Sequence, residues 1–250
     1  MRSFRVIVIQ AVLSLIWFPS QAQSSEGAFS LGTGFVVAED YLVTAAHVLR
    51  GRDSVWVGPI GPKRWVKAQV IKVNEQHDLA LISAKVEASV VKFARWSDVP
   101  TGLEIFVIGF PQPRLQGLSK KITQGIINGN RSDRNDSFDL GYFQFSAEVQ
   151  QGNSGGPIFS PDGLVVGMVQ KKLNALSVAE KTNDLPVNVN YGLKSSEIIH
   201  FLAGTPAEVN MSALSLQTVL RPYQLFAQNQ SAVFAVVGRK TPVAPEAPRP

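Results

Sequence analysis

Residues 151–157 read Gln-Gly-Asn-Ser-Gly-Gly-Pro and place one serine, Ser154, between glycines. Glycine lacks a Cβ atom, so this stretch permits a tight backbone curl that larger residues would block. Such a curl can point the backbone N–H groups of Gly152 and Ser154 at one spot, where they would bind an oxyanion. A glycine-rich loop can also be a simple turn or a phosphate cradle, but no Lys-Ser/Thr ending or Rossmann spacing accompanies this one. The stretch therefore predicts a reactive serine beside an oxyanion-binding loop.

Two strings upstream supply the partners that a serine nucleophile needs. In residues 43–48 (Val-Thr-Ala-Ala-His-Val), a predicted strand runs into small residues and presents His47 at its end. Asp78 stands directly before a fully apolar predicted strand at residues 79–82. A serine hydroxyl is a weak nucleophile until an imidazole takes its proton, and a carboxylate then orients the imidazole and stabilises its charged form. These residue types, in the order His, Asp, Ser, predict acyl-transfer chemistry.

Other histidines and acids of the chain are less well placed for this chemistry. Asp53 and Asp98 are alternatives for the carboxylate, but only Asp78 leads into an apolar strand. His77 is expected at the rim of the site, because neighbouring residues on a strand face opposite ways. His200 is expected to be structural.

The chain after residue 30 reads as short β-segments separated by turn residues. β-Branched and aromatic residues dominate runs such as 34–37, 65–73 and 164–169, and Gly, Pro, Asn or Asp separate them. One helix is predicted over residues 195–202, with a serine cap at its start, before an apolar stripe, and a Gly-Thr-Pro stop after it. Many short strands with little helix indicate an all-β fold of the sandwich or barrel kind.

The N-terminal segment has the pattern of an export signal. Arg2 and Arg5 precede an apolar run at residues 6–18, and small side chains follow as far as Ala22. We predict a signal peptide at residues 1–22, cleaved after Ala22. An uncleaved membrane anchor is the alternative, although the apolar run is shorter than the roughly 20 residues that span a bilayer.

Composition excludes several classes of function. The chain has 250 residues and no cysteine, which excludes a disulfide scaffold, a thiolate zinc site and a cysteine nucleophile. Three histidines leave little room for a multi-histidine metal centre, and we expect neither a metal nor another cofactor. The formal net charge is +5, and loss of the two arginines of the signal leaves +3. This excess is too small to predict a nucleic-acid partner.

The three strings resemble the signatures of the trypsin/chymotrypsin-fold serine proteases, and most closely those of the cysteine-free bacterial branch that includes the HtrA proteases. Residues 32–37 (Gly-Thr-Gly-Phe-Val-Val), 108–111 (Ile-Gly-Phe-Pro) and 123–127 (Thr-Gln-Gly-Ile-Ile) are similar to the same branch. The resemblance covers about residues 28–202. It implies an all-β fold of two six-stranded antiparallel β-barrels with a short C-terminal helix and the site in the cleft between the barrels.

The resemblance also implies how the chain is divided. We expect an N-terminal barrel at residues 23–98, which would carry His47 and Asp78. A C-terminal barrel with its helix is expected at 99–202 and would carry Ser154. Residues 203–250 form an extension, too short for the PDZ domain that HtrA relatives usually append, with an edge strand within 232–237 and a disordered proline-rich tail.

The function implied is that of an exported serine endopeptidase, periplasmic or secreted, which hydrolyses polypeptides through the triad His47, Asp78 and Ser154 and an acyl-enzyme. We expect no stable membrane insertion once the signal is cleaved, and the residues give no basis for deriving an oligomeric state. The alternative is a catalytically silent scaffold of the same fold that binds unfolded polypeptides.

Two positions bear on specificity and activation. Counting back from Ser154 as in the family places Glu148 at the base of the primary specificity pocket, where it would favour basic side chains before the scissile bond. Alternatively Glu148 points outward, since a one-residue shift reverses the faces of a strand. Asn153 replaces the aspartate that binds a new N-terminal ammonium in the digestive branch, so we expect no zymogen step of that kind.

Overall fold

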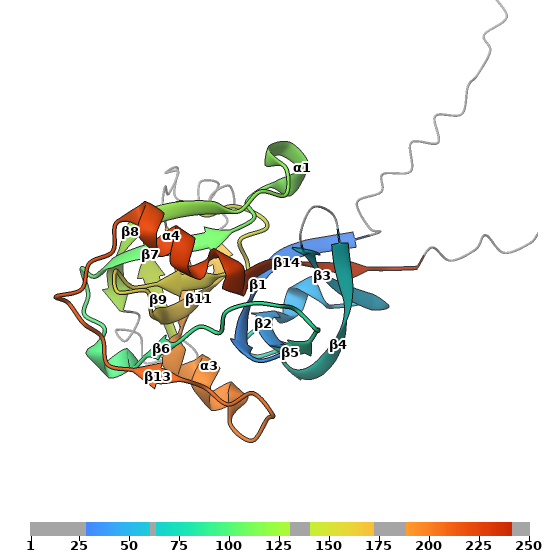
Figure 1. The fold of residues 1–250 in the computed structure, drawn as a ribbon, viewed down its shortest axis with the longest axis horizontal. Helices are drawn as coiled ribbons and strands as arrows, with labels where there is room; N and C mark the ends of the chain where they lie inside the picture. Colours follow the sequence, from blue (N-terminus) through green and yellow to red (C-terminus); the bar gives the residue numbers. More distant parts are fainter. Residues whose placement is uncertain (1–28, 61–63, 131–140, 173–188, 242–250) are drawn as a thin grey trace, which may run out of the picture.

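A computed structural model describes residues 29–60, 64–130, 141–172 and 189–241, which form two β-barrels packed side by side (Figure 1). The predicted signal peptide and the proline-rich tail lie outside the described residues. The all-β prediction with two six-stranded antiparallel barrels is confirmed.

The first barrel closes through six strands in the order β1-β14-β3-β4-β5-β2. Five of these strands come from the N-terminal part of the chain and one from its C-terminal part, so the first barrel extends beyond the range 23–98. The strands are β1 (Phe29–Ala38), β2 (Tyr41–Ala45), β3 (Ser54–Ile60), β4 (Arg64–Asn74), β5 (Leu79–Ser83) and β14 (Val233–Arg239).

The second barrel follows the order β10-β7-β8-β9-β12-β11, and pairing of β10 with β11 closes the ring. Two short strands, β6 (Phe93–Ala94) and β13 (Met211–Ser212), extend its sheet beyond β11 through parallel pairings. The barrel strands are β7 (Glu104–Gly109), β8 (Lys121–Asn130), β9 (Tyr142–Phe145), β10 (Pro157–Phe159), β11 (Val165–Lys172) and β12 (Asn190–Lys194).

Strand β5 shows why the predicted strands are apolar on both faces. Ala80 and Ile82 point into the interior of the first barrel, whereas Leu79 and Leu81 join a core that the two barrels share, where second-barrel residues such as Phe106 also lie. These four apolar residues of β5 are fully buried. A continuous apolar run is typical of a strand covered on both sides, and here one face covers a barrel interior and the other the interface.

Strand β14 corrects the prediction of an edge strand within residues 232–237. It pairs antiparallel with β1 on one side and with β3 on the other, so it is an interior strand of the first barrel. Phe234 and Val236 pack inside that barrel, and Val233 and Ala235 pack in the shared core. The apolar run predicted a strand, but both of its pairing partners lie far away along the chain.

The described helices are few and short. The helix predicted over residues 195–202 is present as α3 (Ser195–Leu202), but Lys194 occupies its N-cap position and no side-chain cap bond forms. No helix in the described ranges is long and apolar enough to cross a membrane. Besides α3, the described helical elements are α1 (Pro113–Gln116), α4 (Pro222–Asn229) and the 3-10 turns η2 (Ala46–Val48), η3 (Trp96–Asp98) and η5 (Gln230–Ala232).

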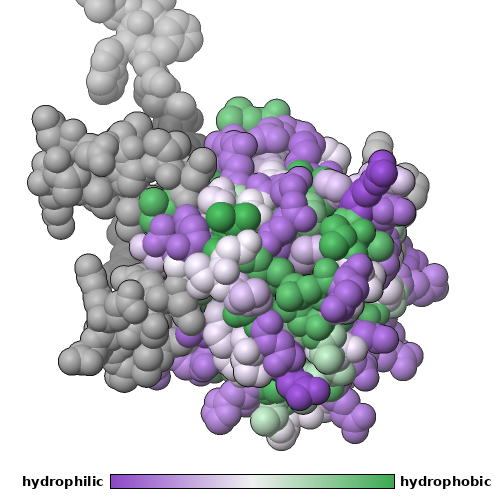
Figure 2. Space-filling model, turned by 90° about the vertical axis from the view of Figure 1, so that its left-hand side faces the viewer, coloured by the Kyte–Doolittle hydropathy of each residue, from purple (hydrophilic) through white to green (hydrophobic). Residues whose placement is uncertain are grey.

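The C-terminal segment wraps the second barrel before it enters the first (Figure 1). Several apolar side chains of this segment are more than half exposed, namely Met211, Leu216, Val219 and Tyr223. Figure 2 shows the end of the molecule around which this segment turns, where apolar patches alternate with polar ones. The burial of β14 therefore contrasts with the exposure of the residues that lead to it.

Candidate active site

The register of two neighbouring strands brings His47 and Asp78 together. β2 and β5 are antiparallel and pair Ala45 with Leu79, so the residues just after β2 lie beside those just before β5. The Ala46 N–H donates to the Asp78 carbonyl at 3.0 Å, which continues the pairing into the turn. His47 and Asp78 are therefore neighbours because of strand register within one barrel.

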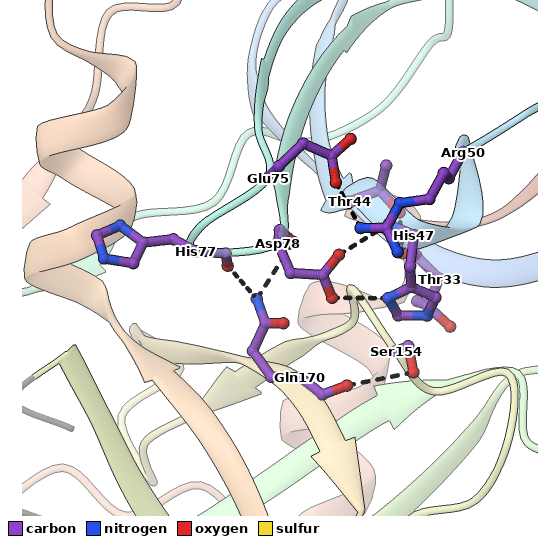
Figure 3. Close-up of polar contacts among 9 residues, drawn as sticks. All are labelled: Thr33, Thr44, His47, Arg50, Glu75, His77, Asp78, Ser154 and Gln170. Carbon is purple, nitrogen blue, oxygen red and sulfur yellow. Dashed lines mark hydrogen bonds and ion pairs between the residues drawn. The ribbon is translucent and has the colours of Figure 1, made fainter. Parts of the chain in front are cut away.

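Both oxygens of the Asp78 carboxylate hold His47. The imidazole Nδ1 lies 2.6 Å from Oδ2, and the backbone N–H of His47 donates to Oδ1 at 2.7 Å (Figure 3). The Asp78 side chain is 10% exposed and that of His47 is 38% exposed. A carboxylate at Nδ1 favours the tautomer with its proton on that nitrogen, which leaves Nε2 able to accept a proton.

The loop that carries Ser154 depends on its glycines. Gly152 and Gly155 have φ values of +103° and +82°, a backbone conformation that residues other than glycine rarely adopt. A Cβ atom would lie 2.2 Å from the Phe110 carbonyl oxygen at Gly152 and 2.4 Å from the Thr33 carbonyl oxygen at Gly155. The tight curl predicted around Ser154 is therefore present.

Thr33, on β1 of the first barrel, secures this loop from the opposite side. Its hydroxyl donates to the Gly152 carbonyl at 2.7 Å, and its N–H donates to the Ser154 carbonyl at 2.9 Å. The N–H groups of Asn153 and Gly155 also have carbonyl partners. Within the described part of the chain, the N–H groups of Gly152 and Ser154 have none. The two amides predicted to bind an oxyanion are thus among those left available in this loop.

The structure places Ser154 close to His47 without joining them. Figure 3 shows the serine beside the imidazole, but no hydrogen bond links the two side chains among the described residues. The Ser154 hydroxyl donates instead to the Gln170 carbonyl at 3.4 Å. The His47–Asp78 half of the predicted triad is assembled, and its contact to Ser154 is open.

Gln170 on β11 is a site residue that the sequence analysis missed. Its side-chain Nε2 donates to the carbonyls of His77 at 3.0 Å and Asp78 at 3.4 Å, so the second barrel supports the backbone of the acid. Gln170 is buried, and in sequence it reads as one polar residue at the end of an apolar strand. Thr33 lies within the family-like string at residues 32–37, but no local feature of the sequence assigns Thr33 or Gln170 to the site.

A cavity of about 530 Å³ contains His47, Gly152 and Ser154 in its wall. Glu148 does not line it: the Glu148 side chain is exposed and accepts a hydrogen bond from Gln150 at 3.2 Å. The structure thus does not bring Glu148 into the cavity with Ser154. The alternative, an outward-facing Glu148, matches this placement.

The other residues considered lie away from the cavity. Asp53 and Asp98 are exposed, and neither lines it. The His77 side chain points away from Asp78 in Figure 3, as expected of a residue at the rim. His200 lies exposed on α3. The structure therefore leaves Asp78 as the acid that contacts His47.

Burial and, secondarily, the negative charges of Asp78 and Glu197 raise the pKa of Tyr142 to about 12, so this phenol stays protonated at neutral pH. Among the described residues, no group of three or more His, Cys, Asp or Glu side chains could hold a metal ion.

Comparison with known proteins assigns the family. Residues 32–168 match the model of the trypsin-like peptidase domain. The chain is 32% identical over 182 residues to y4bJ, an uncharacterised protein of Sinorhizobium fredii, covering 72% of this chain and 28% of that one. It is 34% identical over 155 residues to a DegP-like periplasmic serine endoprotease of Halomonas elongata, covering 60% and 31% of the two chains. It is 30% identical over 203 residues to the serine protease HTRA1B of Danio rerio, covering 78% and 39%.

The chain spans about a third of the length of these curated relatives. A crystal structure of the serine endoprotease from Yersinia pestis has the same fold, with a TM-score of 0.54, 21% identity, and coverage of 68% of this chain and 56% of that one. The double barrel and the match over more than half of its residues establish that this chain belongs to the trypsin-like peptidase family.

Proposed function

We propose that this protein is an exported serine endopeptidase that hydrolyses polypeptides through His47, Asp78 and Ser154. One observation carries the proposal. The imidazole that Asp78 holds at 2.6 Å shares a cavity with Ser154, whose own N–H group and that of Gly152 have no partner among the described residues. A general base, a nucleophile and an oxyanion site are the parts that acyl transfer requires.

In the proposed reaction, His47 Nε2 takes the proton of the Ser154 hydroxyl as its oxygen attacks the peptide carbonyl. The oxyanion that forms accepts hydrogen bonds from the N–H groups of Gly152 and Ser154. His47 then gives the proton to the leaving amine, the C–N bond breaks, and an ester to Ser154 remains. His47 then takes a proton from water as the water oxygen attacks the ester carbonyl; the bond from that carbon to the Ser154 oxygen breaks, the acid product leaves, and His47 gives the proton back to Ser154.

The serine must leave the Gln170 carbonyl before it can react. At 3.4 Å that hydrogen bond is long and therefore weak. Rotation about the Cα–Cβ bond of serine moves the hydroxyl between staggered positions at little cost. Catalytic hydrogen bonds are often long in an unliganded site and shorten when substrate binds, so the open contact is compatible with the proposal.

A fluorophosphonate probe tests this function directly. We expect covalent labelling of the wild type on the peptide that contains Ser154, and no labelling of Ser154→Ala. Ser97→Ala, which alters an exposed serine outside the cavity, is the matched control and should label like the wild type. A folded wild type that the probe does not label would refute the proposal.

The open contact between Ser154 and His47 also favours a second candidate, a catalytically silent scaffold that binds unfolded polypeptides. The two candidates differ in chemistry: both bind peptides, but only the endopeptidase cleaves them and reacts with the probe. Retention of a peptide without cleavage or labelling by the wild type would favour the scaffold.

Export and polypeptide substrates form the remaining part of the proposal. They rest on the signal-like segment at residues 1–22 and on relatives named as periplasmic endoproteases. N-terminal sequencing of the protein from a secreting host should begin at Gln23. A chain that retains Met1 and stays with the membrane fraction would contradict cleavage and favour the anchor.

A further inference from the structure

The described lining of the cavity beside Ser154 contains positively charged side chains and no negatively charged ones. Two arginines, Arg52 and Arg114, line it together with apolar side chains that include Phe29, Leu31 and Leu115. No carboxylate is among the described residues of its wall. A confined surface with cationic and apolar groups but no acid favours a ligand that combines negative charge with apolar area.

This cavity lies on the side of Ser154 where a leaving group would sit. One wall is the start of β1 and the turn that bears His47, and the opposite wall is the segment around α1. Under the proposed function His47 protonates the leaving amine, so the residues after the scissile bond must lie against the His47 side. Gln170, which faces the serine from β11, does not line this cavity.

Arg114 packs against an aromatic ring of the cavity lining. Its guanidinium lies over the ring of Phe29, 4.6 Å from the centroid, which joins α1 to the first residue of β1. A contact with a ring uses none of the N–H donors of a guanidinium, so Arg114 can still donate two parallel hydrogen bonds to a carboxylate. Neither of the ion pairs found within the described ranges involves Arg114.

We propose that this side of the cleft selects peptides with an acidic side chain within the first residues after the scissile bond, and that Arg114 is the main determinant, with Arg52 in support. The inference rests on the proposed function and adds a substrate class to it. Because Arg114 is exposed, its contribution should be that of a surface ion pair, about two- to fivefold in kcat/KM.

The test uses fluorogenic peptides that are identical except for Glu, Gln or Lys at the second residue after the cleaved bond. We expect kcat/KM to fall in that order for the wild type, and the spread to shrink as salt is raised, because salt screens exposed charges. Arg114→Gln should remove most of the spread, because only Arg52 then remains, and Arg114→Glu should reverse it. Arg64→Glu makes the same charge change at an exposed position of β4 outside the cavity and should keep the wild-type order.

Binding separates this inference from the catalytic one. The same peptides, carrying a fluorophore, are titrated into Ser154→Ala and followed by anisotropy. The inference is supported if Ser154→Ala binds the Glu peptide more tightly than the Lys peptide and if adding Arg114→Glu reverses this order, even if the wild type cleaves nothing. Cleavage with equal rates for the three peptides overturns it and leaves the endopeptidase standing, and equal or undetectable binding overturns it as well.

Discussion

The two barrels hold their parts of the site in different ways. In the first barrel, His47 and Asp78 lie at the ends of paired strands, so strand register alone fixes their contact at 2.6 Å. In the second barrel, Ser154 lies in a loop whose position depends on Thr33 from across the interface. The contact made within one sheet is closed, whereas the contact made between the barrels is open. The contact within the first barrel is therefore set by strand pairing, whereas the Ser154 loop is held across the interface by a few individual hydrogen bonds from Thr33.

The barrels also differ in how they close. All six strands of the second barrel come from one stretch, β7 to β12, whereas the first barrel needs β14 from far along the chain. The half of the site whose contact is closed thus belongs to the barrel with the more distant closing strand. The predictions below test each side of this contrast.

Removal of β14 should have the largest effect. Deletion of residues 233–250 exposes the facing edges of β1 and β3 and removes buried side chains such as Phe234 and Val233 from two cores. At about 1.5–3 kcal/mol for each large buried side chain, the loss approaches the total stability of a typical domain. We expect no cooperative unfolding transition by circular dichroism.

Deletion of residues 242–250 alone leaves β14 in place and is the control, which should melt like the wild type. A cooperative transition in the longer deletion, close to that of the wild type, would show that the first barrel does not need its sixth strand.

Asp78→Asn should have the next largest effect, on turnover. An amide at this position favours the wrong tautomer of His47, and the analogous change in a serine-protease triad lowers kcat about 10⁴-fold. Glu75→Gln is the control, because Glu75 pairs with Arg50 on the exposed side and does not touch His47. Peptide turnover within tenfold of the wild type for Asp78→Asn would count against the proposed role of the acid.

Thr33→Val tests the contact between the barrels. The change removes a hydroxyl that donates to the Gly152 carbonyl and accepts from the Phe110 N–H, leaving buried groups unpaired at about 1–3 kcal/mol. We expect a lower free energy of unfolding in urea together with a fall in kcat, because the oxyanion loop loses its anchor.

Thr44→Val is the matched control for Thr33→Val. The Thr44 hydroxyl donates to the Thr33 carbonyl, a bond within the first barrel, so its loss should lower stability more than kcat. An equal fall of kcat in both variants would mean that the loop does not depend on Thr33 in particular.

The smallest expected effect is a pH-dependent change in Tm from a hydrogen bond just after β14. The Thr241 N–H donates to the Asp53 carboxylate at 2.6 Å and lowers the pKa of Asp53. A lowered pKa stabilises the folded state above the ordinary carboxyl pKa of about 3.9, and this contribution is lost as the pH falls through the lowered value. Asp53→Asn should therefore lower Tm slightly at neutral pH, and the difference in Tm from the wild type should shrink as the pH falls below the ordinary carboxyl pKa.

Local patterns in the sequence predicted much of the site, and contacts between distant strands account for what they missed. His47 and Asp78 were predictable because each adjoins a strand with an unambiguous apolar pattern. Thr33 and Gln170 were not, since a single polar residue in a strand does not indicate what lies opposite it. Glu148 shows the sensitivity to register, because one residue decides which face of a strand it occupies.

Contacts between distant strands also explain why β14 was wrongly predicted to be an edge strand. Its apolar run predicted a strand, but its partners lie about 200 residues earlier in the chain, and a local pattern cannot distinguish an edge strand from one with two neighbours. The six-stranded count was expected from family resemblance, whereas the origin of the sixth strand was visible only in the structure.

The late position of β14 has a consequence for biosynthesis. It follows β5 by about 150 residues, so a nascent polypeptide has made the other five strands of its barrel, and the whole second barrel, before the missing one emerges. Until then β1, which bears Thr33, has a vacant edge. Assembly of the candidate site is thus coupled to synthesis of β14: fragments that end before it contain His47, Asp78 and Ser154 but not the closed barrel that carries His47 and Asp78.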